Sequence, residues 1–402
     1  MNGREVFLVG GVRTPVGKHR GALSSVRADE LAALVVREVI DRAGLTRASQ
    51  DGVVEEVILG AANQAGEDNR NLARMAVLLA GLPVSTPGYT VNRLCASGLT
   101  AVAAAAQAVA AGENDLVVAG GAESMTRAPW ALAKPGTPWA EPGEIVDTAL
   151  GWRFVNPRMP ALDEGRATLS LGETAEEVAA LDGITREESD SFAERSHRLA
   201  TAARDAGRFD AEITAVHTSD GRVAQDETVR PGTTLDRLGQ LRPVFRADGV
   251  VTAGSSSPLA DGASAVIVAS QEAIERHGLT PRARILGCAS AGVRPSLMGL
   301  GPVPATQKLL ARLGLVVGDL DAVEINEAFA PQVLACIRRL DLDPEPVNAD
   351  GGAIALGHPL GSSGCRLLVT LLGRLEREGA RRGLATLCVG VGQGVALAVE
   401  RV

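Results

Sequence analysis

Short apolar runs alternate with amphipathic stretches along the first 120 residues of the chain. The apolar runs are bounded by turn residues, as in buried strands, and the stretches between them repeat apolar side chains at helical spacing. Strands are therefore predicted at residues 6–9, 56–59, 89–92 and 116–119, and helices at residues 28–43, 71–80 and 99–111. Such alternation favours a largely parallel sheet with helices on its faces.

This alternation is interrupted after Met125. Six prolines lie between Pro129 and Pro160, the three tryptophans lie within residues 130–152, and charged amphipathic helices are predicted at residues 173–181 and 186–206. Long segments of this kind are usually functional or interfacial. We therefore expect an inserted loop domain that contributes contacts between subunits.

The α/β pattern returns with a predicted strand at residues 263–269 and continues from residue 285. In each regular part a Ser-Gly pair opens a long helix, Ser97-Gly98 in the first and Ser363-Gly364 in the second, followed by a turn, a strand and glycines. This repetition predicts two similar halves whose loops face each other. The expected division is an N-terminal half of residues 1–124 and 251–282, an inserted loop domain of residues 125–250, and a C-terminal half of residues 283–402.

Composition narrows the class of protein. Hydrophobic residues make up 46% of the 402 positions but aromatic residues only 2%, so the core must consist of Ala, Val and Leu, with 46 glycines allowing close backbone packing. This apolar content excludes a disordered chain. A net charge of −8 without a basic block argues against a nucleic-acid partner. Since we recognise neither a long apolar run nor a signal peptide, we expect a cytoplasmic protein without a membrane partner.

The number and spacing of the cysteines favour a catalytic thiol over disulfide bonds. Their number is odd and they form no C-x-x-C pair, so neither a disulfide framework nor a metal site is expected from Cys95, Cys288, Cys336, Cys365 and Cys388. Cys95 lies between a predicted strand and the start of a long helix, where the helix dipole and free N–H groups lower the pKa of a thiol. It is a candidate nucleophile.

His358 lies in a glycine-rich segment just before a predicted helix, where an imidazole can act as general base for a thiol. The other four histidines lie among charged or turn residues and are expected at the surface: His19, His197, His217 and His277. Asn326 lies where a strand gives way to a helix, so it is either a helix cap or a site residue.

Cys388 ends an apolar strand and is followed by alternating glycines. The glycines look like a dinucleotide-binding loop, but too few residues follow Gly394 to form the helix that receives a pyrophosphate. We therefore expect the glycines to let backbone N–H groups approach a substrate oxygen.

Four segments together resemble the thiolase family: Asn92-Arg-Leu-Cys-Ala-Ser-Gly98, Asn326-Glu-Ala-Phe-Ala330, Gly351-Gly-Ala-Ile-Ala-Leu-Gly-His-Pro-Leu-Gly361 and Cys388-Val-Gly-Val-Gly392. They occur in the family's order and the resemblance covers nearly the whole chain. It implies an α/β fold with two βαβαβαββ halves in five α-β-α-β-α layers and a loop domain inserted in the first half.

The resemblance also implies roles for five residues. Cys95 would attack the 3-keto carbon of a 3-oxoacyl-CoA and carry the acyl group, with His358 activating its thiol. Cys388 would protonate the acetyl-CoA enolate and then serve as base for the incoming coenzyme A. Asn326 would hold a water beside His358, and the N–H groups of Cys95 and Gly390 would form an oxyanion hole.

For coenzyme A, the matching positions are Arg230, Ser257 and Met298. Coenzyme A is a substrate in this family, and the resemblance implies no permanently bound cofactor and a homodimer or homotetramer. One departure is Ser255, which stands where relatives usually carry Asn after Thr-Ala-Gly. This puts the local hydrogen bonding of that loop in question.

Within the family, residues 62–71, 122–129 and 151–156 are most similar to 3-oxoadipyl-CoA thiolases of aromatic degradation, which form succinyl-CoA and acetyl-CoA. Acetoacetyl-CoA thiolases typically have His-Met where this chain has Ser170-Leu171. An acetoacetyl-CoA or fatty 3-oxoacyl-CoA substrate stays open as an alternative. A decarboxylating ketosynthase is disfavoured because such enzymes use a Cys-His-His site. A non-catalytic acyl-CoA or lipid-binding relative is disfavoured because all four segments are present.

Overall fold

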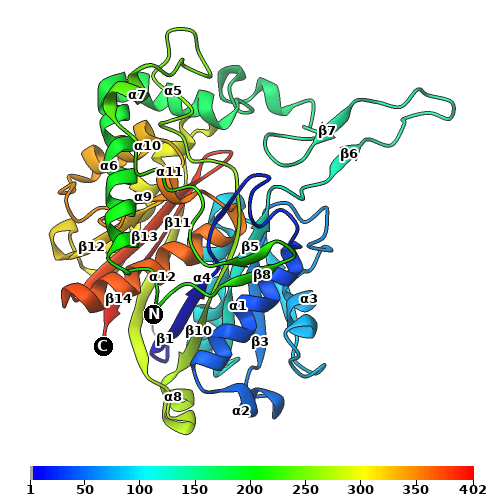
Figure 1. Ribbon diagram of the computed structural model, residues 1–402, viewed down its shortest axis with the longest axis vertical. Coiled ribbons are helices and arrows are strands. Elements are labelled where there is room, and N and C mark those ends of the chain that lie inside the picture. The colour runs from blue at the N-terminus through cyan, green and yellow to red at the C-terminus, as the bar shows by residue number, and fades with distance from the viewer. Residues whose placement is uncertain (1–2) are drawn as a thin grey trace.

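Ten strands form one continuous sheet in the computed structural model, which describes residues 3–402 (Figure 1). The order along its main path is β12-β13-β14-β11-β1-β10-β5-β3-β4, and the short β2 (Gly17–Lys18) pairs with β10. The N-terminal part consists of β1 (Val6–Arg13), β3 (Glu56–Gly60), β4 (Gly88–Val91), β5 (Leu116–Ser124) and β10 (Ala260–Ser270). The C-terminal part consists of β11 (Pro281–Gly292), β12 (Ala322–Ile325), β13 (Arg382–Val389) and β14 (Gln393–Arg401).

The expectation of a largely parallel sheet is wrong, because the sheet is mixed. Parallel pairing joins β3 to β4, β3 to β5 and β12 to β13, and the other pairs described are antiparallel. The inserted segment returns the chain beside the end of β5, where Asp261 faces Ser124, so β10 must run in the opposite direction. The turn Gly390–Gly392 likewise joins β13 and β14 as a hairpin, which needs no crossover helix.

Five layers nevertheless stack as expected. Helices α1 (Ala28–Arg42) and α3 (Leu72–Leu79) cover the outer face of the N-terminal part of the sheet. Helices α4 (Ser97–Ala111) and α12 (Leu360–Glu378) lie between the two parts, and α9 (Pro302–Leu313) and α10 (Ala330–Leu340) cover the other outer face (Figure 1). The predicted α-β-α-β-α architecture is confirmed.

The two central helices touch through their backbones. A Cβ atom added to Gly98 would lie 2.6 Å from the carbonyl oxygen of Gly361, and one added to Gly364 would lie 2.4 Å from the backbone nitrogen of Leu99. The repeated Ser-Gly pairs therefore have a structural cause, since only glycine permits this approach. The segment Leu94–Ala111 is long and apolar enough to cross a membrane, but here it is mostly buried between the sheet layers.

The inserted segment forms its own small elements. Helix α5 (Leu171–Asp182) and helix α6 (Arg186–Asp205) occupy the predicted helical stretches, and both begin with a capping box. The hairpin of β6 (Trp130–Leu132) and β7 (Ile145–Asp147) projects away from the body of the molecule (Figure 1). The remaining elements are α2 (Thr46–Gln50), β8 (Val216–Thr218), β9 (Gly221–Val223), α7 (Leu235–Gly239), α8 (Gln271–His277) and α11 (Ala353–Leu356). The division of the chain into two halves and a loop domain stays a prediction.

Some strands extend beyond the apolar runs that predicted them. Strand β1 passes through Gly10 and Gly11, whose positive φ angles of 65° and 131° form a bulge between Val9 and Val12. Strand β5 continues through Gly120, where an added Cβ would lie 2.1 Å from the carbonyl oxygen of Ser264. Glycine weakens the apolar pattern by which a strand is predicted from sequence. The full length of such a strand is therefore seen only from its pairing with neighbouring strands.

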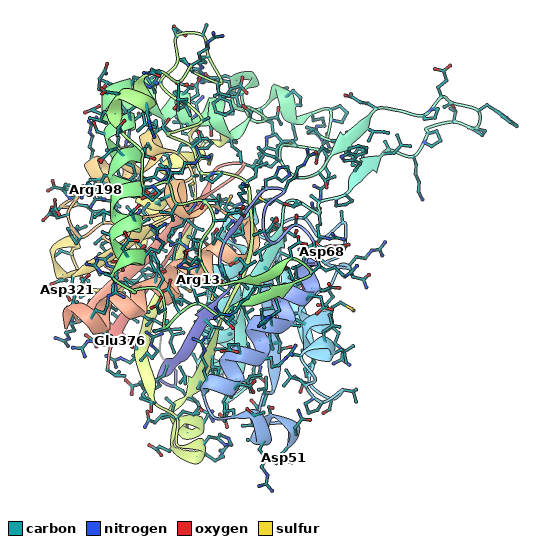
Figure 2. All side chains as sticks on the ribbon, in the orientation of Figure 1. Arg13, Asp51, Asp68, Arg198, Asp321 and Glu376 are labelled. Carbon is teal, nitrogen blue, oxygen red and sulfur yellow. The ribbon has the colours of Figure 1, made fainter. Side chains whose placement is uncertain are left out.

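A buried arginine joins β1 to the inserted segment. Arg13 is fully buried, with its guanidinium 2.7 Å from Glu212 and 2.7 Å from Asp226. Figure 2 shows Arg13 in the interior, whereas charged side chains such as Asp51 and Asp321 lie at the periphery. Since removing one member of a buried ion pair leaves an uncompensated charge, this cluster holds the inserted segment on the sheet.

Candidate active site

Cys95 lies in a single 3₁₀ turn, Leu94–Ala96, between β4 and α4. Leu94 has a φ of 48°, and the Ser97 hydroxyl stabilises the turn by accepting the N–H of Arg93 at 2.9 Å and donating to the carbonyl of Leu94 at 2.7 Å. The turn directs the Cys95 thiol into the layer between the sheets, where it is buried. The nucleophile candidate is therefore held by local hydrogen bonds and by the core.

The pKa of Cys95 differs from the sequence-based expectation. Burial raises the pKa of its thiol to about 11, although the N–H groups of Gly390 and of Cys95 itself act in the opposite direction. The predicted lowering is therefore wrong, because the sulfur has lost its hydration and two N–H groups do not compensate. At neutral pH the thiol is protonated.

His358 is a neutral base in the same layer. Burial, aided by the positive charge of Arg366, lowers the pKa of His358 to about 3. Its Nδ1 lies 2.6 Å from the Ser363 hydroxyl, which donates its own proton to the carbonyl of Pro359 at 2.9 Å. Ser363 must therefore accept the Nδ1 proton, which leaves the lone pair on Nε2. The amide nitrogen of Asn326 lies 3.3 Å from that Nε2.

Asn326 is not a helix cap. Helix α10 begins at Ala330 with Phe329 as its N-cap, and Asn326 instead follows β12 with its side chain fully buried. Its amide nitrogen faces His358, and its Oδ1 accepts no hydrogen bond from the described residues. Asn326 is thus a polar group of the site, held between the strand and the imidazole.

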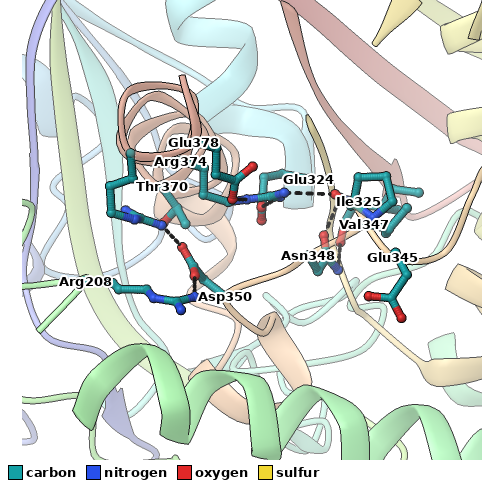
Figure 3. A network of polar contacts seen from close by, with 12 residues as sticks. Arg208, Glu324, Ile325, Glu345, Val347, Asn348, Asp350, Thr370, Arg374 and Glu378 are labelled. Atoms are coloured by element: carbon teal, nitrogen blue, oxygen red, sulfur yellow. Dashed lines mark hydrogen bonds and ion pairs between the residues drawn. The ribbon is translucent and has the colours of Figure 1, made fainter. Parts of the chain in front are cut away.

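A buried polar network fixes the two loops that carry Asn326 and His358 (Figure 3). Glu324, on β12, forms an ion pair of 2.7 Å with Arg374 of α12, and both side chains are nearly fully buried. Asn348 bonds Ile325 twice, with its Oδ1 accepting the backbone N–H and its Nδ2 donating to the carbonyl, each at 2.8 Å. Together they tie the end of β12 to the loop before His358.

The loop before His358 has further charged anchors. Asp350 is fully buried and pairs with Arg208 at 2.8 Å (Figure 3). It also pairs with Arg377. Glu327 accepts the Ser196 hydroxyl at 2.6 Å, the Asn348 amide at 2.8 Å and the N–H of Ile354 at 3.1 Å. Sequence reasoning missed these positioning residues. The one available signal was an acidic residue, Glu324, inside an apolar strand.

Cys388 lies at the end of β13, in a cluster with Met298 and Phe329. Burial raises the pKa of its thiol well above the usual value, and the neighbouring Cys95 raises it further. In the turn that follows, a Cβ added to Gly390 would lie 2.7 Å from the ring of Trp152. Gly390 can therefore present its N–H to Cys95 only because it has no side chain.

One cleft of about 520 Å³ brings the predicted residues together. It is lined by the two thiols and the imidazole, and also by the three positions expected to contact coenzyme A: Cys95, His358, Cys388, Arg230, Ser257 and Met298. Asn326 and Gly390 join the site through their contacts with His358 and Cys95. A groove of about 510 Å³, lined by Arg230 and Arg237, continues from the cleft toward the surface.

The expectation that His197 lies at the surface is wrong. His197 is buried on α6 and lines the groove, and its Nδ1 accepts the backbone N–H of Arg230 at 3.2 Å. Burial, followed by the charge of Arg230, lowers the pKa of His197 to about 4, so the ring is neutral. The neighbouring Arg198 is exposed, whereas His197 lies on the buried face of the helix with Ser196 and Ala200, so the charged neighbours in the sequence were misleading.

Ser255 replaces the usual Asn without breaking the loop. Its hydroxyl accepts the N–H of Thr252 at 2.9 Å, and its carbonyl accepts the N–H of Ala330 at 2.9 Å. The next residues are held as well, since the N–H of Ser257 bonds the carbonyl of Ala328 at 3.0 Å. The short Ser255 side chain therefore provides a hydrogen-bond acceptor within the loop that carries Ser257.

A smaller cavity of about 80 Å³ adjoins the cleft beside Cys95. It is lined by members of all three segments that resemble 3-oxoadipyl-CoA thiolases: Ala62, Asn63, Glu123, Met125, Ala128, Gly151, Trp152 and Arg153. Leu171, from the Ser170-Leu171 pair, also lines it. Segments that are far apart in the sequence thus form one wall beside the nucleophile.

A duplicated five-layer fold with two thiols and one imidazole at a single cleft defines an acyl-transferring enzyme with a cysteine nucleophile. The family model "Thiolase, N-terminal domain" matches residues 6–272, and "Thiolase, C-terminal domain" matches residues 279–401. The chain belongs to the thiolase family, as its four segments predicted, and is an acyltransferase.

Related thiolases are similar to this chain over its full length. The chain is 53% identical to a beta-ketoadipyl-CoA thiolase of Pseudomonas aeruginosa, over 99% of this chain and 100% of that protein. It is 51% identical to the 3-oxoadipyl-CoA/3-oxo-5,6-dehydrosuberyl-CoA thiolase of Escherichia coli K12, with the same coverage. The crystal structure of human mitochondrial 3-ketoacyl-CoA thiolase in complex with CoA superposes with a TM-score of 0.91 at 40% identity, covering 99% of this chain and 98% of that one.

The raised pKa of Cys95 predicts how its alkylation depends on pH. The thiolate is the reactive form, so the iodoacetamide rate at Cys95 should rise about tenfold per pH unit from 7 to 9.5 without levelling off. The rate is followed on the Cys95 peptide by mass spectrometry, with free cysteine, which levels off near its own pKa of about 8.5, as reference. A plateau at Cys95 below pH 8 would contradict the assignment.

Proposed function

We propose that the enzyme cleaves 3-oxoadipyl-CoA with coenzyme A into succinyl-CoA and acetyl-CoA. The observation that carries the substrate is the cavity of about 80 Å³ beside Cys95, which is lined by polar as well as apolar groups. A water-sized probe needs only about 10–15 Å³ of such volume, so a short chain fits and a long fatty chain does not. The names of relatives 51–53% identical to this chain support the same substrate.

In the first step, the Cys95 sulfur forms a bond to the C3 carbonyl carbon while Nε2 of His358 takes the thiol proton. Both groups are neutral before attack, because burial raises the pKa of Cys95 and lowers that of His358. The negative charge that develops on the substrate oxygen needs donors, and the protonated Nε2 and a water on Asn326 would supply them.

In the second step, the bond between C2 and C3 breaks and its electron pair becomes the enolate of acetyl-CoA. The Cys388 thiol gives its proton to C2, and the acyl group stays on Cys95. Burial keeps the Cys388 thiol protonated until a strong base such as the enolate is formed. Acetyl-CoA then leaves through the cleft.

In the third step, coenzyme A enters, and Cys388 as thiolate takes the proton of its thiol. The new thiolate attacks the acyl-Cys95 carbonyl, whose oxyanion faces the N–H groups of Cys95 and Gly390, and Cys95 leaves as the thiol after His358 returns the proton. Arg230, with Arg237 along the groove, suits the phosphate end of coenzyme A, and Ser257 suits the pantetheine amides. Met298 supplies an apolar wall.

We also propose a homodimer or homotetramer located in the cytoplasm. The projecting hairpin bears large apolar side chains in solvent, with Trp139 99% exposed, Trp130 72% and Ile145 60%. Strand β4 is an open edge of the sheet. Such features are usual at contacts between subunits. The five free cysteines suit a reducing compartment.

The substrate assignment predicts a preference among three purified thioesters. With coenzyme A in excess, kcat/KM should be highest for 3-oxoadipyl-CoA, lower for acetoacetyl-CoA and lowest for 3-oxohexadecanoyl-CoA, whose tail exceeds the cavity. Loss of the 3-oxoacyl-CoA enolate absorbance or release of acetyl-CoA serves as the measurement. Equal or faster cleavage of the long-chain substrate would contradict the proposal.

The different roles proposed for the two thiols predict different defects when each is replaced. Cys388→Ala should still accept an acetyl group on Cys95 from acetyl-CoA, but should lose turnover and α-proton exchange by about 10²–10⁴-fold. Cys95→Ser should lose acylation itself, because a serine hydroxyl is far harder to ionise. Mass spectrometry of the Cys95 peptide and deuterium exchange at C2 distinguish the two. Normal exchange in Cys388→Ala would remove Cys388 from the mechanism.

The exposed hairpin predicts an effect on assembly. Light scattering at micromolar concentration should give the mass of a dimer or tetramer, and Trp139→Glu should lower that mass, with the circular dichroism unchanged. The exposed Leu162→Glu, outside the hairpin, serves as a control that keeps the wild-type mass. A monomeric wild-type protein would contradict the assembly.

A further inference from the structure

We propose that Arg153 binds the terminal carboxylate of the acyl chain and thereby selects a dicarboxylic 3-oxoacyl-CoA. This inference rests on the proposed function and names the group that sets its specificity. It concerns the cavity of about 80 Å³ that Cys95, Gly390, Trp152 and Arg153 line together. The cavity adjoins the coenzyme A cleft, since Cys95, Leu171 and Leu360 line both, so an acyl group on Cys95 can extend into it.

The cavity is continuous with the reacting atoms. The N–H of Gly390 lies near enough to the Cys95 sulfur to act on the pKa of its thiol, and the Trp152 ring covers Gly390 so closely that an added Cβ would lie 2.7 Å away. Trp152 is itself fixed, since its Nε1 donates to the carbonyl of Leu169 at 3.1 Å. Arg153 follows directly in the chain and lines the same wall. A short chain on Cys95 can therefore reach the guanidinium.

Arg153 is held in place by neutral groups alone. Its Nη2 donates to the backbone carbonyl of Asn63 at 3.0 Å and to the Asn63 side-chain oxygen at 3.2 Å, and its Nη1 lies 3.4 Å from the carbonyl of Thr148. Asn63 is fixed in turn by a bond of 3.1 Å from its amide to the Thr148 hydroxyl. The guanidinium is thus oriented without having its charge neutralised.

The guanidinium of Arg153 forms no ion pair among the described residues, whereas those of Arg127 and Arg166 do. Arg127 forms an ion pair with Glu67 at 2.5 Å, and Arg166 forms one with Glu177 at 2.9 Å. A guanidinium that is oriented by neutral acceptors keeps its positive charge available to a bound anion. Among the groups that an acyl chain can carry, a carboxylate best matches the planar guanidinium, because the two can form paired hydrogen bonds.

The one carboxylate of the cavity wall does not supply that charge. Glu123 is buried and accepts the N–H groups of Ala62 at 2.8 Å, Asn63 at 3.2 Å and Gly361 at 2.9 Å. Burial raises the pKa of Glu123 to about 7, so its negative charge is weakened. Its oxygens hold the surrounding loops and leave Arg153 free for the substrate.

The chemistry of the acyl group matches this arrangement. Attack at C3 of 3-oxoadipyl-CoA leaves a succinyl group on Cys95, in which two methylenes separate the thioester from the carboxylate. The apolar wall of Trp152 and Leu94 suits the methylenes, and Arg153 suits the carboxylate. An acetyl group is too short to reach Arg153, and a fatty chain would bury its tail against a cation.

The test compares two substrates of equal chain length, 3-oxoadipyl-CoA and 3-oxohexanoyl-CoA, which differ in the terminal carboxylate. In Arg153→Met, kcat/KM for 3-oxoadipyl-CoA should fall about 10- to 100-fold, while that for 3-oxohexanoyl-CoA should stay the same or rise. Arg153→Lys keeps the charge but not the paired donors, so it should give an intermediate ratio. Arg158→Met, an exposed arginine of the same segment, should leave both values unchanged.

The outcomes separate this inference from the proposed function. If wild-type enzyme does not cleave 3-oxoadipyl-CoA, the proposed function fails. If it does, and Arg153→Met and Arg153→Lys leave the ratio of the two substrates unchanged, Arg153 has only a structural role and the inference is overturned. Equal loss on both substrates has the same meaning. A second readout is acylation of Cys95 by succinyl-CoA against butyryl-CoA, where only the succinyl reaction should depend on Arg153.

Discussion

The contact between the backbones of α4 and α12 is the constraint on which the site depends. Gly98 and Gly364 let the two central helices meet without side chains between them, and Gly361 passes equally close to Gly121 of β5, where an added Cβ would lie 2.0 Å from its carbonyl oxygen. Cys95 precedes the first helix and His358 the second. A methyl group here would overpack the centre, which typically costs about 1–3 kcal/mol. It would also shift the thiol from the imidazole, and misplacement by about 1 Å can cost about 10²-fold in rate.

Burial at this contact also decides the electrostatics of the reaction. The layer between the sheets disfavours every charge, so the pKa of Cys95 rises to about 11 and that of His358 falls to about 3. A thiolate–imidazolium pair is therefore not the resting state. The substrate must bring the carbonyl whose oxygen receives the charge, and the donors around it stabilise that charge only after attack begins. This arrangement protects a free thiol from side reactions when no substrate is bound.

Local properties of the fold could be predicted from the sequence, and properties set by distant contacts could not. The helix at residues 28–43 was predicted within one residue of α1, because amphipathic spacing is local information. Pairing direction was mispredicted, because it depends on where the inserted segment returns the chain. His197 and the pKa of Cys95 were misjudged for the same reason, since burial depends on which element packs above a residue. The segments that carry Cys95, His358 and Cys388 were visible because glycines at close approaches leave a mark in the sequence.

The two halves and the inserted segment contribute different parts of the enzyme. The halves carry the candidate reacting groups at equivalent helix starts, and two buried carboxylates there are paired, Glu324 with Arg374 and Asp350 with Arg208. Arg153 lies on the inserted segment and is oriented by neutral groups only, so its charge is available to a ligand. A core whose glycines touch backbone to backbone tolerates little change, whereas a loop wall beside the nucleophile can be altered without moving it. With the role proposed for Arg153, the inserted segment would contribute to the selection of the acyl chain, and the duplicated core would carry the chemistry.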